Sequence, residues 1–172
     1  MITIRLATDE DLPAILEIYN HVIIHTTAVF QYTIHTPEMR KEWFETKKEQ
    51  GFPVFVALEG TVIAGFSTIG WFRAWQAYKY SVENSVYVDS KFRGRGIGKK
   101  LLEPLIDAAK TLNMHTIVAG IEAANIESIK LHEKFGFREV AHFKEVGFKF
   151  GRWLDLKFLQ LVLVTPTDPK DG

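Results

Sequence analysis

A turn that holds three glycines within six residues constrains this chain more than any other feature of its sequence. The turn, Arg93-Gly94-Arg95-Gly96-Ile97-Gly98, follows a predicted strand at 81–88 and precedes a helical pattern that includes Leu101, Leu102 and Leu105. A strand, a glycine turn and a helix start together expose unpaired backbone N–H groups at the positive end of the helix dipole. The sequence therefore predicts an α/β chain with a phosphate-binding turn. The alternative is a tight turn that binds no ligand.

The composition excludes several classes of function. The chain has 172 residues, of which 47% are hydrophobic and 13% aromatic, so it is large enough for one compact domain with a core. Its 21 basic and 21 acidic residues balance, which leaves no basic field for nucleic acid or an anionic membrane surface. Without cysteine, the chain has no disulfide framework, no thiolate metal cluster and no cysteinyl intermediate. We predict a small-molecule or peptide partner.

Three further expectations concern location, domain limits and metal. The N-terminus has no signal-peptide pattern and no apolar run reaches membrane-spanning length, so we expect the cytoplasm and no membrane contact. We expect one domain, residues 1–164, followed by a disordered tail at 165–172 that has no apolar side chain to bury. The spacing of His21, His25 and His35 matches no zinc motif, and we predict no metal.

Hydrophobic periodicity and capping residues predict the secondary structure. Strands are expected at 2–6, 54–58, 61–69, 81–88, 115–121, from 137, and at 153–164. Helices are expected after a capping box of Thr8 and Asp11, from Thr36-Pro37 to Gly51, after the glycine turn, and from Asn125 to Phe135. Pro104 lies inside the third helix and should bend it. Glu59-Gly60 predicts a hairpin turn in which the glycine has positive φ.

Two familiar nucleotide motifs do not fit the glycine turn. A Walker A loop needs four residues between its first glycine and Gly-Lys, then Ser or Thr; Gly94 lies too close to Gly98, and no hydroxyl residue follows Lys99. The Rossmann motif needs Gly-x-Gly-x-x-Gly, whereas the chain has Gly94-x-Gly96-x-Gly98. The turn instead matches Arg/Gln-x-x-Gly-x-Gly/Ala, through Arg93, Gly96 and Gly98.

This pattern resembles the pyrophosphate turn of the GNAT superfamily of N-acetyltransferases. A second block agrees, because the stretch from Asn125 to Phe137 is similar to the family's asparagine-led helix that ends in Gly-Phe. The similarity is closer still to the phosphinothricin and methionine sulfoximine acetyltransferase branch, and it covers nearly the whole chain. Further marks of that branch are Asn20-His21, Thr26-Thr27, the strand at 81–88 and the stretch 147–155.

The resemblance implies a single α/β domain of the α+β type, with a mixed central sheet that is splayed at the acetyl-CoA site and helices on both faces. It also implies a homodimer with acetyl-CoA as co-substrate. The residues that the resemblance places at acetyl-CoA are Val86, Tyr87 and Val88 for the pantetheine arm, Arg93, Gly94, Arg95, Gly96, Ile97, Gly98 and Lys99 for the pyrophosphate, and Asn125, Ser128 and Lys134 for the rest.

Acyl transfer to an amine needs a base, because most alkyl amines are protonated at neutral pH. Glu83 is the candidate, since partial desolvation within an apolar strand raises the pKa of a carboxyl group; a solvent-facing strand glutamate is the alternative. In the tetrahedral intermediate the thioester oxygen becomes negatively charged, and the backbone N–H of Val88 is the candidate donor that stabilises it. His132 is the candidate general acid that protonates the leaving thiolate of coenzyme A. It stands at a position where many family members have a tyrosine, and a purely structural role for this histidine is the alternative.

The aromatic segment 71–80, which precedes the predicted strand at 81–88, supplies the candidate acceptor site. Its aromatic residues can wall a pocket, and Arg73 can bind a carboxylate through two hydrogen bonds. The resemblance places Phe72, Arg73, Ala74, Glu83, Asn84 and Ser85 at the acceptor. A surface role for Arg73 is one alternative. Another is a dimer interface formed by the aromatic residues of this segment, Trp71, Trp75, Tyr78 and Tyr80.

These features predict direct acetyl transfer from acetyl-CoA to the amine of a small amino acid or analogue, such as phosphinothricin or methionine sulfoximine, without a covalent enzyme intermediate. Two alternatives stay open. One is an N-acetyltransferase for protein N-termini or polyamines, in which a polyamine site would carry acidic residues in place of Arg73. The other is a non-catalytic acyl-CoA-binding sensor on the same fold.

Overall fold

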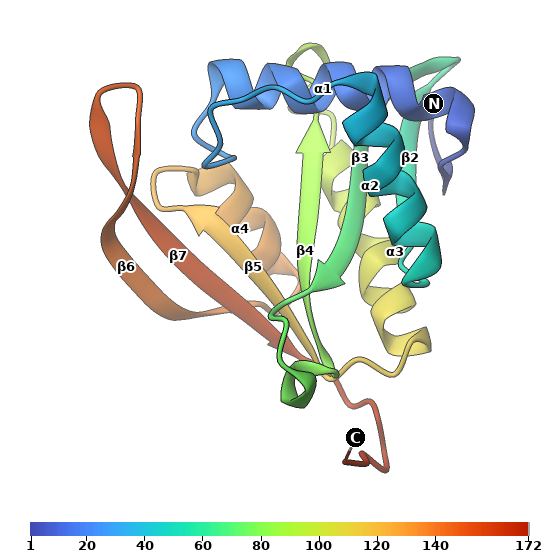
Figure 1. The fold of residues 1–172 in the computed structure, drawn as a ribbon, viewed down its shortest axis with the longest axis vertical. Coiled ribbons are helices and arrows are strands. Elements are labelled where there is room, and N and C mark those ends of the chain that lie inside the picture. The colour runs from blue at the N-terminus through green and yellow to red at the C-terminus, as the bar shows by residue number, and fades with distance from the viewer. Residues whose placement is uncertain (172) are drawn as a thin grey trace. The chain divides into compact units, whose positions relative to one another are not determined.

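Seven strands and four α-helices form the fold of the computed structural model, which describes residues 1–171 (Figure 1). The strands are β1 (Ile2–Leu6), β2 (Val54–Glu59), β3 (Val62–Trp71), β4 (Ser81–Val88), β5 (Thr116–Glu122), β6 (Arg138–Lys149) and β7 (Arg152–Val162). The helices are α1 (Leu12–His25), α2 (Pro37–Glu49), α3 (Ile97–Thr111) and α4 (Ile126–Lys134), with short 3-10 turns at Asp9–Asp11, Gln76–Tyr78 and Ser90–Phe92.

The strands are hydrogen-bonded in the order β1-β2-β3-β4-β5-β7-β6 and form one mixed sheet. β4 pairs with β5 in parallel, whereas β1 with β2, β2 with β3, β5 with β7 and β6 with β7 are antiparallel. The register between β4 and β5 ends at Glu83 and Val118, although β4 continues to Val88. The expected α/β fold with a mixed sheet is confirmed. The pairing of β4 with β5 ends midway along β4, the strand on which the splay was expected.

Local sequence signals placed most elements within a residue or two. β4 has the bounds expected for it, and α2 and α4 begin at their predicted caps, because the side chains of Thr36 and Asn125 each accept a backbone N–H from the first turn. Gly60 has a φ of +64° in the turn between β2 and β3, as predicted. α3 continues through Pro104 to Thr111, so the proline does not end the helix.

Two compact units can be distinguished within the described chain. Unit 1 contains Met1–Ile69 and Ser85–Leu105, and unit 2 contains Gly70–Asn84 and the described residues from Ile106 onward. The boundary passes through β3, β4 and α3. The two ends of each of these elements therefore belong to different units.

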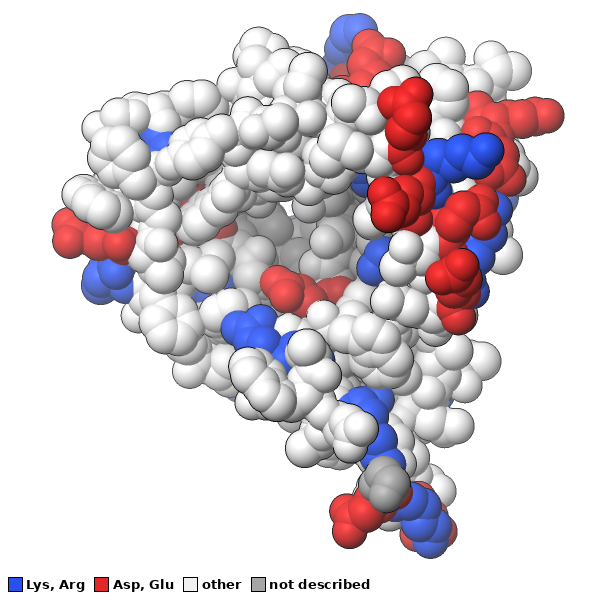
Figure 2. All heavy atoms as spheres, viewed as in Figure 1, with Lys and Arg blue, Asp and Glu red and all other residues white. Residues whose placement is uncertain are grey.

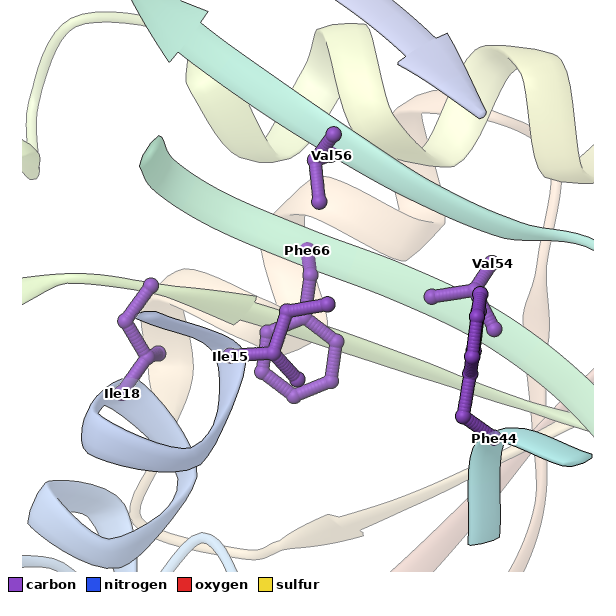
Figure 3. Close-up of a cluster of buried hydrophobic side chains, with 6 residues drawn as sticks. All are labelled: Ile15, Ile18, Phe44, Val54, Val56 and Phe66. Atoms are coloured by element: carbon purple, nitrogen blue, oxygen red, sulfur yellow. The ribbon is translucent and has the colours of Figure 1, made fainter. Parts of the chain in front are cut away.

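Unit 1 has helices on both faces of its strands. On one face, side chains of α1 and α2 pack against β2 and β3 through Ile15, Ile18, Phe44, Val54, Val56 and Phe66 (Figure 3). On the other face, α3 packs against the same strands through Ala57, Ala64, Ile97 and Leu101. Consecutive residues of β2 therefore serve opposite faces, and both faces are covered. This explains why β2 is an unbroken apolar run rather than an alternating one.

A buried arginine joins α2 to the loop that precedes it in unit 1. Arg40 is only 2% exposed, and its guanidinium carbon lies 4.1 Å from the centre of the Tyr19 ring and 4.5 Å from that of Trp43. One of its terminal nitrogens lies 3.1 Å from Nδ1 of His35. Burial lowers the pKa of Arg40, as expected for a cation taken out of water. Two aromatic rings thus take the place that a carboxylate commonly has beside a buried arginine.

Unit 2 contains β5, β7, β6 and α4. Pairing runs from Thr116 with Val162 to Glu122 with Leu156 between β5 and β7. A bulge in β6 is held by Asp155 of β7, whose carboxylate accepts hydrogen bonds from the N–H of Glu145 and from Nζ of Lys144, both at 2.9 Å. These bonds lower the pKa of Asp155 to about 2. The clamp keeps β6 paired with β7 on both sides of the bulge.

The segment after β7 makes hydrogen bonds within unit 2. Oγ1 of Thr165 donates to the carbonyl oxygen of Met114 at 2.6 Å, and the N–H of Lys170 donates to the hydroxyl oxygen of Tyr80 at 3.0 Å. The disorder expected of residues 165–172 stays a prediction. Gly172, its last residue, lies outside the described residues.

Charged side chains of both signs are mixed over α2 on the face shown in Figure 2, at the right of the view. The surface of α2 therefore presents no field of a single sign.

In residues 1–171, no helix is long and apolar enough to cross a membrane. The same part of the chain has no cluster of three or more His, Cys, Asp or Glu side chains that could bind a metal ion.

Candidate active site

The glycine turn lies in unit 1, between the end of β4 and the start of α3. Gly94 has a φ of +76° and Gly96 a φ of +73°, both in the left-handed region that favours glycine. A Cβ added at either position would meet nothing within 4 Å beyond the adjacent residues. The backbone conformation therefore explains the glycines, and the space beside them is open to a ligand.

The turn also supplies donors and positive charge. α3 begins at Ile97, and the first N–H groups of a helix have no partner inside it. Arg93 and Lys99 are exposed, whereas Arg95 donates to a carboxylate oxygen of Glu59 at 2.7 Å. Open backbone, N–H donors and cationic side chains together fit the diphosphate of coenzyme A. Arg95 is paired with a carboxylate of the protein, and the contacts of Arg93, Arg95 and Lys99 with the diphosphate stay predictions.

The second half of β4 runs very close to β3 in unit 1. Gly65 makes this approach possible, because a Cβ there would lie 2.6 Å from the carbonyl oxygen of Tyr87 and 3.2 Å from Cα of Val88. The Tyr87 ring has its centre 5.1 Å from that of Phe66 and 5.5 Å from that of Tyr19. The backbone of the predicted pantetheine segment therefore lies close against β3, and its Tyr87 ring packs with Phe66 of β3 and Tyr19 of α1.

Glu83 lies in unit 2, on the half of β4 that pairs with β5. Its side chain is half-buried, and its Oε1 would lie 2.9 Å from a Cβ added at Gly120 of β5. Burial raises the pKa of Glu83, and the guanidinium of Arg73 opposes this with a smaller effect. Such an environment makes a glutamate more basic than it is in water, as a proton acceptor requires.

Arg73 is exposed in the connection between β3 and β4. One terminal nitrogen donates to the carbonyl oxygen of Phe72 at 2.8 Å, and the guanidinium carbon lies 4.2 Å from the centre of the Phe72 ring. Ala74, the next residue, is also exposed. The guanidinium is near enough to Glu83 to lower the pKa of that carboxyl group. A planar cation resting on an aromatic ring in this way can bind a carboxylate.

His132 is buried on α4, with both ring nitrogens engaged. Nδ1 lies 2.8 Å from the carbonyl oxygen of Ser128, and Nε2 lies 2.9 Å from Nδ2 of Asn84. A carbonyl oxygen only accepts, so Nδ1 carries the proton and Nε2 accepts from the Asn84 amide. Burial lowers the pKa of His132, which favours this neutral form. The geometry favours the structural alternative for His132, and its role as general acid stays a prediction.

The start and end of α4 carry the remaining predicted donor-site residues. Oδ1 of Asn125 accepts the N–H of Ser128 at 3.2 Å, which caps the helix. Lys134 is the last residue of α4 and is exposed. Asn125 and Ser128 are thus placed by the helix start itself, and their contact with coenzyme A stays a prediction.

The predicted site residues divide between the two units. Unit 1 holds Ser85, Val86, Tyr87, Val88 and Arg93 to Lys99; unit 2 holds Phe72, Arg73, Ala74, Glu83, Asn84, Asn125, Ser128, His132 and Lys134. The sequence did not predict two residues beside Glu83, Gly120 and Phe158. A glycine inside a strand is a usable signal of close approach, whereas no sequence pattern marks Phe158.

Comparison with known proteins identifies the family. The sequence profile of the acetyltransferase (GNAT) domain matches residues 4–157. The chain belongs to the GNAT acetyltransferase family. This GNAT acetyltransferase is 45% identical, over 94% of both chains, to the L-methionine sulfoximine/L-methionine sulfone acetyltransferase of Salmonella typhimurium. It is 42% identical, over 97% of both chains, to the L-amino acid N-acyltransferase of Escherichia coli.

A solved structure agrees with these relatives. An acetyltransferase from Salmonella typhimurium, solved with acetyl-CoA, superposes on this GNAT acetyltransferase with a TM-score of 0.96. The two are 43% identical, and the match covers 99% of this chain and 98% of that one. The family resemblance, the fold and the enzyme class expected from the sequence are confirmed.

Proposed function

We propose that this GNAT acetyltransferase moves the acetyl group of acetyl-CoA to the amine of a small amino acid or analogue, of the methionine sulfoximine or phosphinothricin type. The observation that carries the proposal is a half-buried carboxyl group, Glu83, within the electrostatic reach of an exposed guanidinium, Arg73. A base and a carboxylate-binding cation match the two charged ends of an amino acid. The names of the relatives in Salmonella typhimurium and Escherichia coli support the same acceptor class.

Acetyl-CoA supplies an acetyl group activated as a thioester. We assign its diphosphate to the N–H groups and cations of Arg93 to Lys99, its pantetheine arm to Val86, Tyr87 and Val88, and its remaining parts to Asn125, Ser128 and Lys134. The open space beside Gly94 and Gly96 supports the first assignment. The similar structure with acetyl-CoA supports the choice of donor.

Glu83 acts as the base in this proposal. An alkylammonium has no free electron pair, so it must lose a proton before its nitrogen attacks. The ionised Glu83 carboxylate accepts that proton, directly or through water. The backbone N–H of Val88 donates a hydrogen bond to the acetyl oxygen as that oxygen gains negative charge. The proposal includes no covalent bond to the enzyme.

His132 holds Asn84 in place, and Asn84 is the residue next to the base on β4. The proton on Nδ1 of His132 is held by the Ser128 carbonyl, and Nε2 accepts from Asn84. We retain His132 as the candidate proton donor to the leaving thiolate, a role that stays a prediction. If His132→Phe reduces activity only on the alkaline side of the pH profile, His132 is the general acid.

We further propose a homodimer, which the family resemblance implies. At the end of the β6–β7 hairpin, Phe150 is 57% exposed and Trp153 is 59% exposed, and aromatic side chains of this kind are enriched in interfaces. Sedimentation equilibrium tests this, and a monomer would contradict it. The cytoplasmic location and the limits of the catalytic domain, 1–164, stay predictions.

Replacing Gly96 with valine should weaken acetyl-CoA binding about tenfold or more, because the β-branched side chain blocks the approach of the backbone to the diphosphate. Isothermal titration measures the affinity, and the rise in melting temperature with acetyl-CoA checks it. ATP and NAD should raise the wild-type melting temperature much less.

Gly51→Val is the matched control, since Gly51 also has a positive φ, +72°, but lies in the turn between α2 and β2. It carries the same backbone strain, and no residue assigned to the donor site lies in that turn. Equal acetyl-CoA affinity in wild type and Gly96→Val would place the diphosphate elsewhere.

A screen of amines for thiol release from acetyl-CoA tests the acceptor. We expect rapid release with methionine sulfoximine, phosphinothricin or a free amino acid, and slow release with spermidine or a peptide N-terminus. Preference for the polyamine or the peptide would contradict the proposed acceptor. Binding of acetyl-CoA without turnover on any amine would indicate a sensor instead of an enzyme.

A further inference from the structure

Two uncharged residues without an assigned role lie beside the carboxyl group of Glu83 in unit 2. Gly120 is in the interior of β5 and Phe158 is on β7. The register of these strands places Gly120 directly opposite Phe158. The two residues are therefore neighbours, and β5, which carries Gly120, lies next to β4, which carries Glu83.

Gly120 leaves the space that the carboxyl group occupies. A Cβ at this position would lie 2.9 Å from Oε1 of Glu83 and 3.3 Å from Cε1 of Phe158. The first distance is shorter than a carbon and an oxygen that are not bonded to each other normally allow, so any larger residue would displace the carboxyl group or the ring. Because both atoms lie close to one point, the carboxyl group and the ring are themselves neighbours.

The ring of Phe158 is fixed by two other aromatic rings. Phe72 meets it with a centroid distance of 6.1 Å and an interplanar angle of 88°, and Phe143 with 5.7 Å and 87°. Edge-to-face contacts of this kind set the orientation of a ring as well as its position. Phe72 also carries the guanidinium of Arg73, 4.2 Å from its centre. One aromatic array thus positions both the surface beside Glu83 and the nearby cation.

Among the described residues, Arg73 is the charged group that acts on the pKa of Glu83. β5 and β7 present the uncharged Gly120 and Phe158, and the β3–β4 connection presents Arg73. The next residue on β4, Asn84, is hydrogen-bonded to the neutral His132. Burial raises the pKa of Glu83 more than Arg73 lowers it. The proton affinity of Glu83 therefore depends mainly on the exclusion of water by its neighbours.

We propose that Gly120 and Phe158 are positioning residues for acetyl transfer: Gly120 provides the space, and Phe158 the water-excluding surface, that keep the Glu83 carboxyl group in place as base. The inference rests on the proposed role of Glu83. It extends that role to two residues that do not themselves exchange a proton.

Phe158→Leu tests the water-excluding surface through the dependence of kcat/KM on pH. A smaller side chain lets water reach the carboxylate and stabilises its ionised form. The acidic limb should therefore move to lower pH by about one pH unit, and kcat should fall by up to about tenfold as the base weakens. Loss of a merely structural contact would lower the melting temperature and leave the limb where it is. Should Phe158→Leu not fold, Phe158→Met keeps more of the volume and is read in the same way.

Gly120→Ala tests the space. The displaced carboxyl group should lower kcat roughly 10- to 100-fold, because a shift on the order of 1 Å is costly for a reacting group. The affinity for acetyl-CoA should stay unchanged. In a Glu83→Gln background, neither Gly120→Ala nor Phe158→Leu should lower kcat further, since both act through the same carboxylate.

The outcomes separate this inference from the proposed function. An unmoved acidic limb in Phe158→Leu, together with full kcat in Gly120→Ala, overturns the inference if Glu83→Gln is itself inactive. Additive losses in the double variants overturn it as well. Full activity of Glu83→Gln overturns the role of Glu83 as base, and the inference with it.

Discussion

Glu83→Gln should lower kcat by about 100- to 10,000-fold at neutral pH, the usual contribution of a positioned base. Glutamine keeps the shape of the side chain but cannot take up a proton at this pH. The side chain lies beside Gly120 in unit 2, where a change of shape would disturb the packing, so an isosteric change is the right test. The affinity for acetyl-CoA should stay the same, because the residues assigned to the diphosphate lie elsewhere in the chain. Steady-state kinetics and titration measure the two quantities separately.

The pH dependence of this loss carries most of the information. A base acts in its ionised form, so activity falls as the pH drops through the pKa of Glu83, which burial raises above that of an exposed glutamate. The acidic limb of the wild-type profile should therefore lie at higher pH than an exposed carboxyl group would give. The deficit of Glu83→Gln should shrink at high pH, where the free amine is already deprotonated.

Glu139→Gln is the matched control for Glu83→Gln. Glu139 is exposed on β6 and pairs with Lys157, so the same substitution there should leave kcat unchanged. If Glu83→Gln retains full activity at neutral pH, Glu83 is not the base.

Arg73→Ala should raise the KM for a free amino acid roughly 10- to 100-fold for each strong hydrogen bond that is lost. The guanidinium lies over the Phe72 ring, within electrostatic reach of Glu83, and its planar fork can hold a carboxylate in one orientation. Lysine at this position should restore only part of the loss, because it supplies charge without the fork. Imprecise orientation of the substrate should also lower kcat.

An amino-acid amide provides a second test of the contact between the Arg73 guanidinium and the substrate carboxylate. Wild type acting on an amino-acid amide should resemble Arg73→Ala acting on the acid, since either change removes the same contact. Combining the two changes should give no further loss. Arg138→Ala, at an exposed arginine that begins β6, is the control and should leave KM unchanged. Equal acetylation of acid and amide by wild type would rule out Arg73 as a carboxylate clamp.

Signals within a few residues of sequence predicted much of the fold, whereas the contacts of the donor-site residues with coenzyme A stay predictions. Thr36 and Asn125 cap helices where expected, and Gly60 turns the hairpin with positive φ. The glycine turn lies between a strand and a helix as predicted, and the left-handed conformation of Gly94 and Gly96 is a finding of the structure. Each of these features depends on backbone geometry within about one turn of chain, so the local sequence is sufficient to specify it.

The surroundings of the reactive groups were decided by tertiary structure. Gly120 and Phe158 reach Glu83 only because β5 pairs with β4 on one side and with β7 on the other. Nε2 of His132 is engaged because Asn84, 48 positions earlier in the sequence, packs against α4, whereas Nδ1 is engaged by Ser128 of the same helix.

Arg40 shows the same division between sequence and structure. The sequence alone does not distinguish Arg40 from an exposed arginine of a helix. The packing of α1 against α2 buries it between the rings of Tyr19 and Trp43. The sequence by itself determined which residue types could do the chemistry and how the backbone turns around them. Pairing across long sequence separations decided which side chains meet, and therefore how basic the Glu83 carboxyl group is and whether His132 has a free nitrogen, because burial and hydrogen-bond partners are properties of the whole fold.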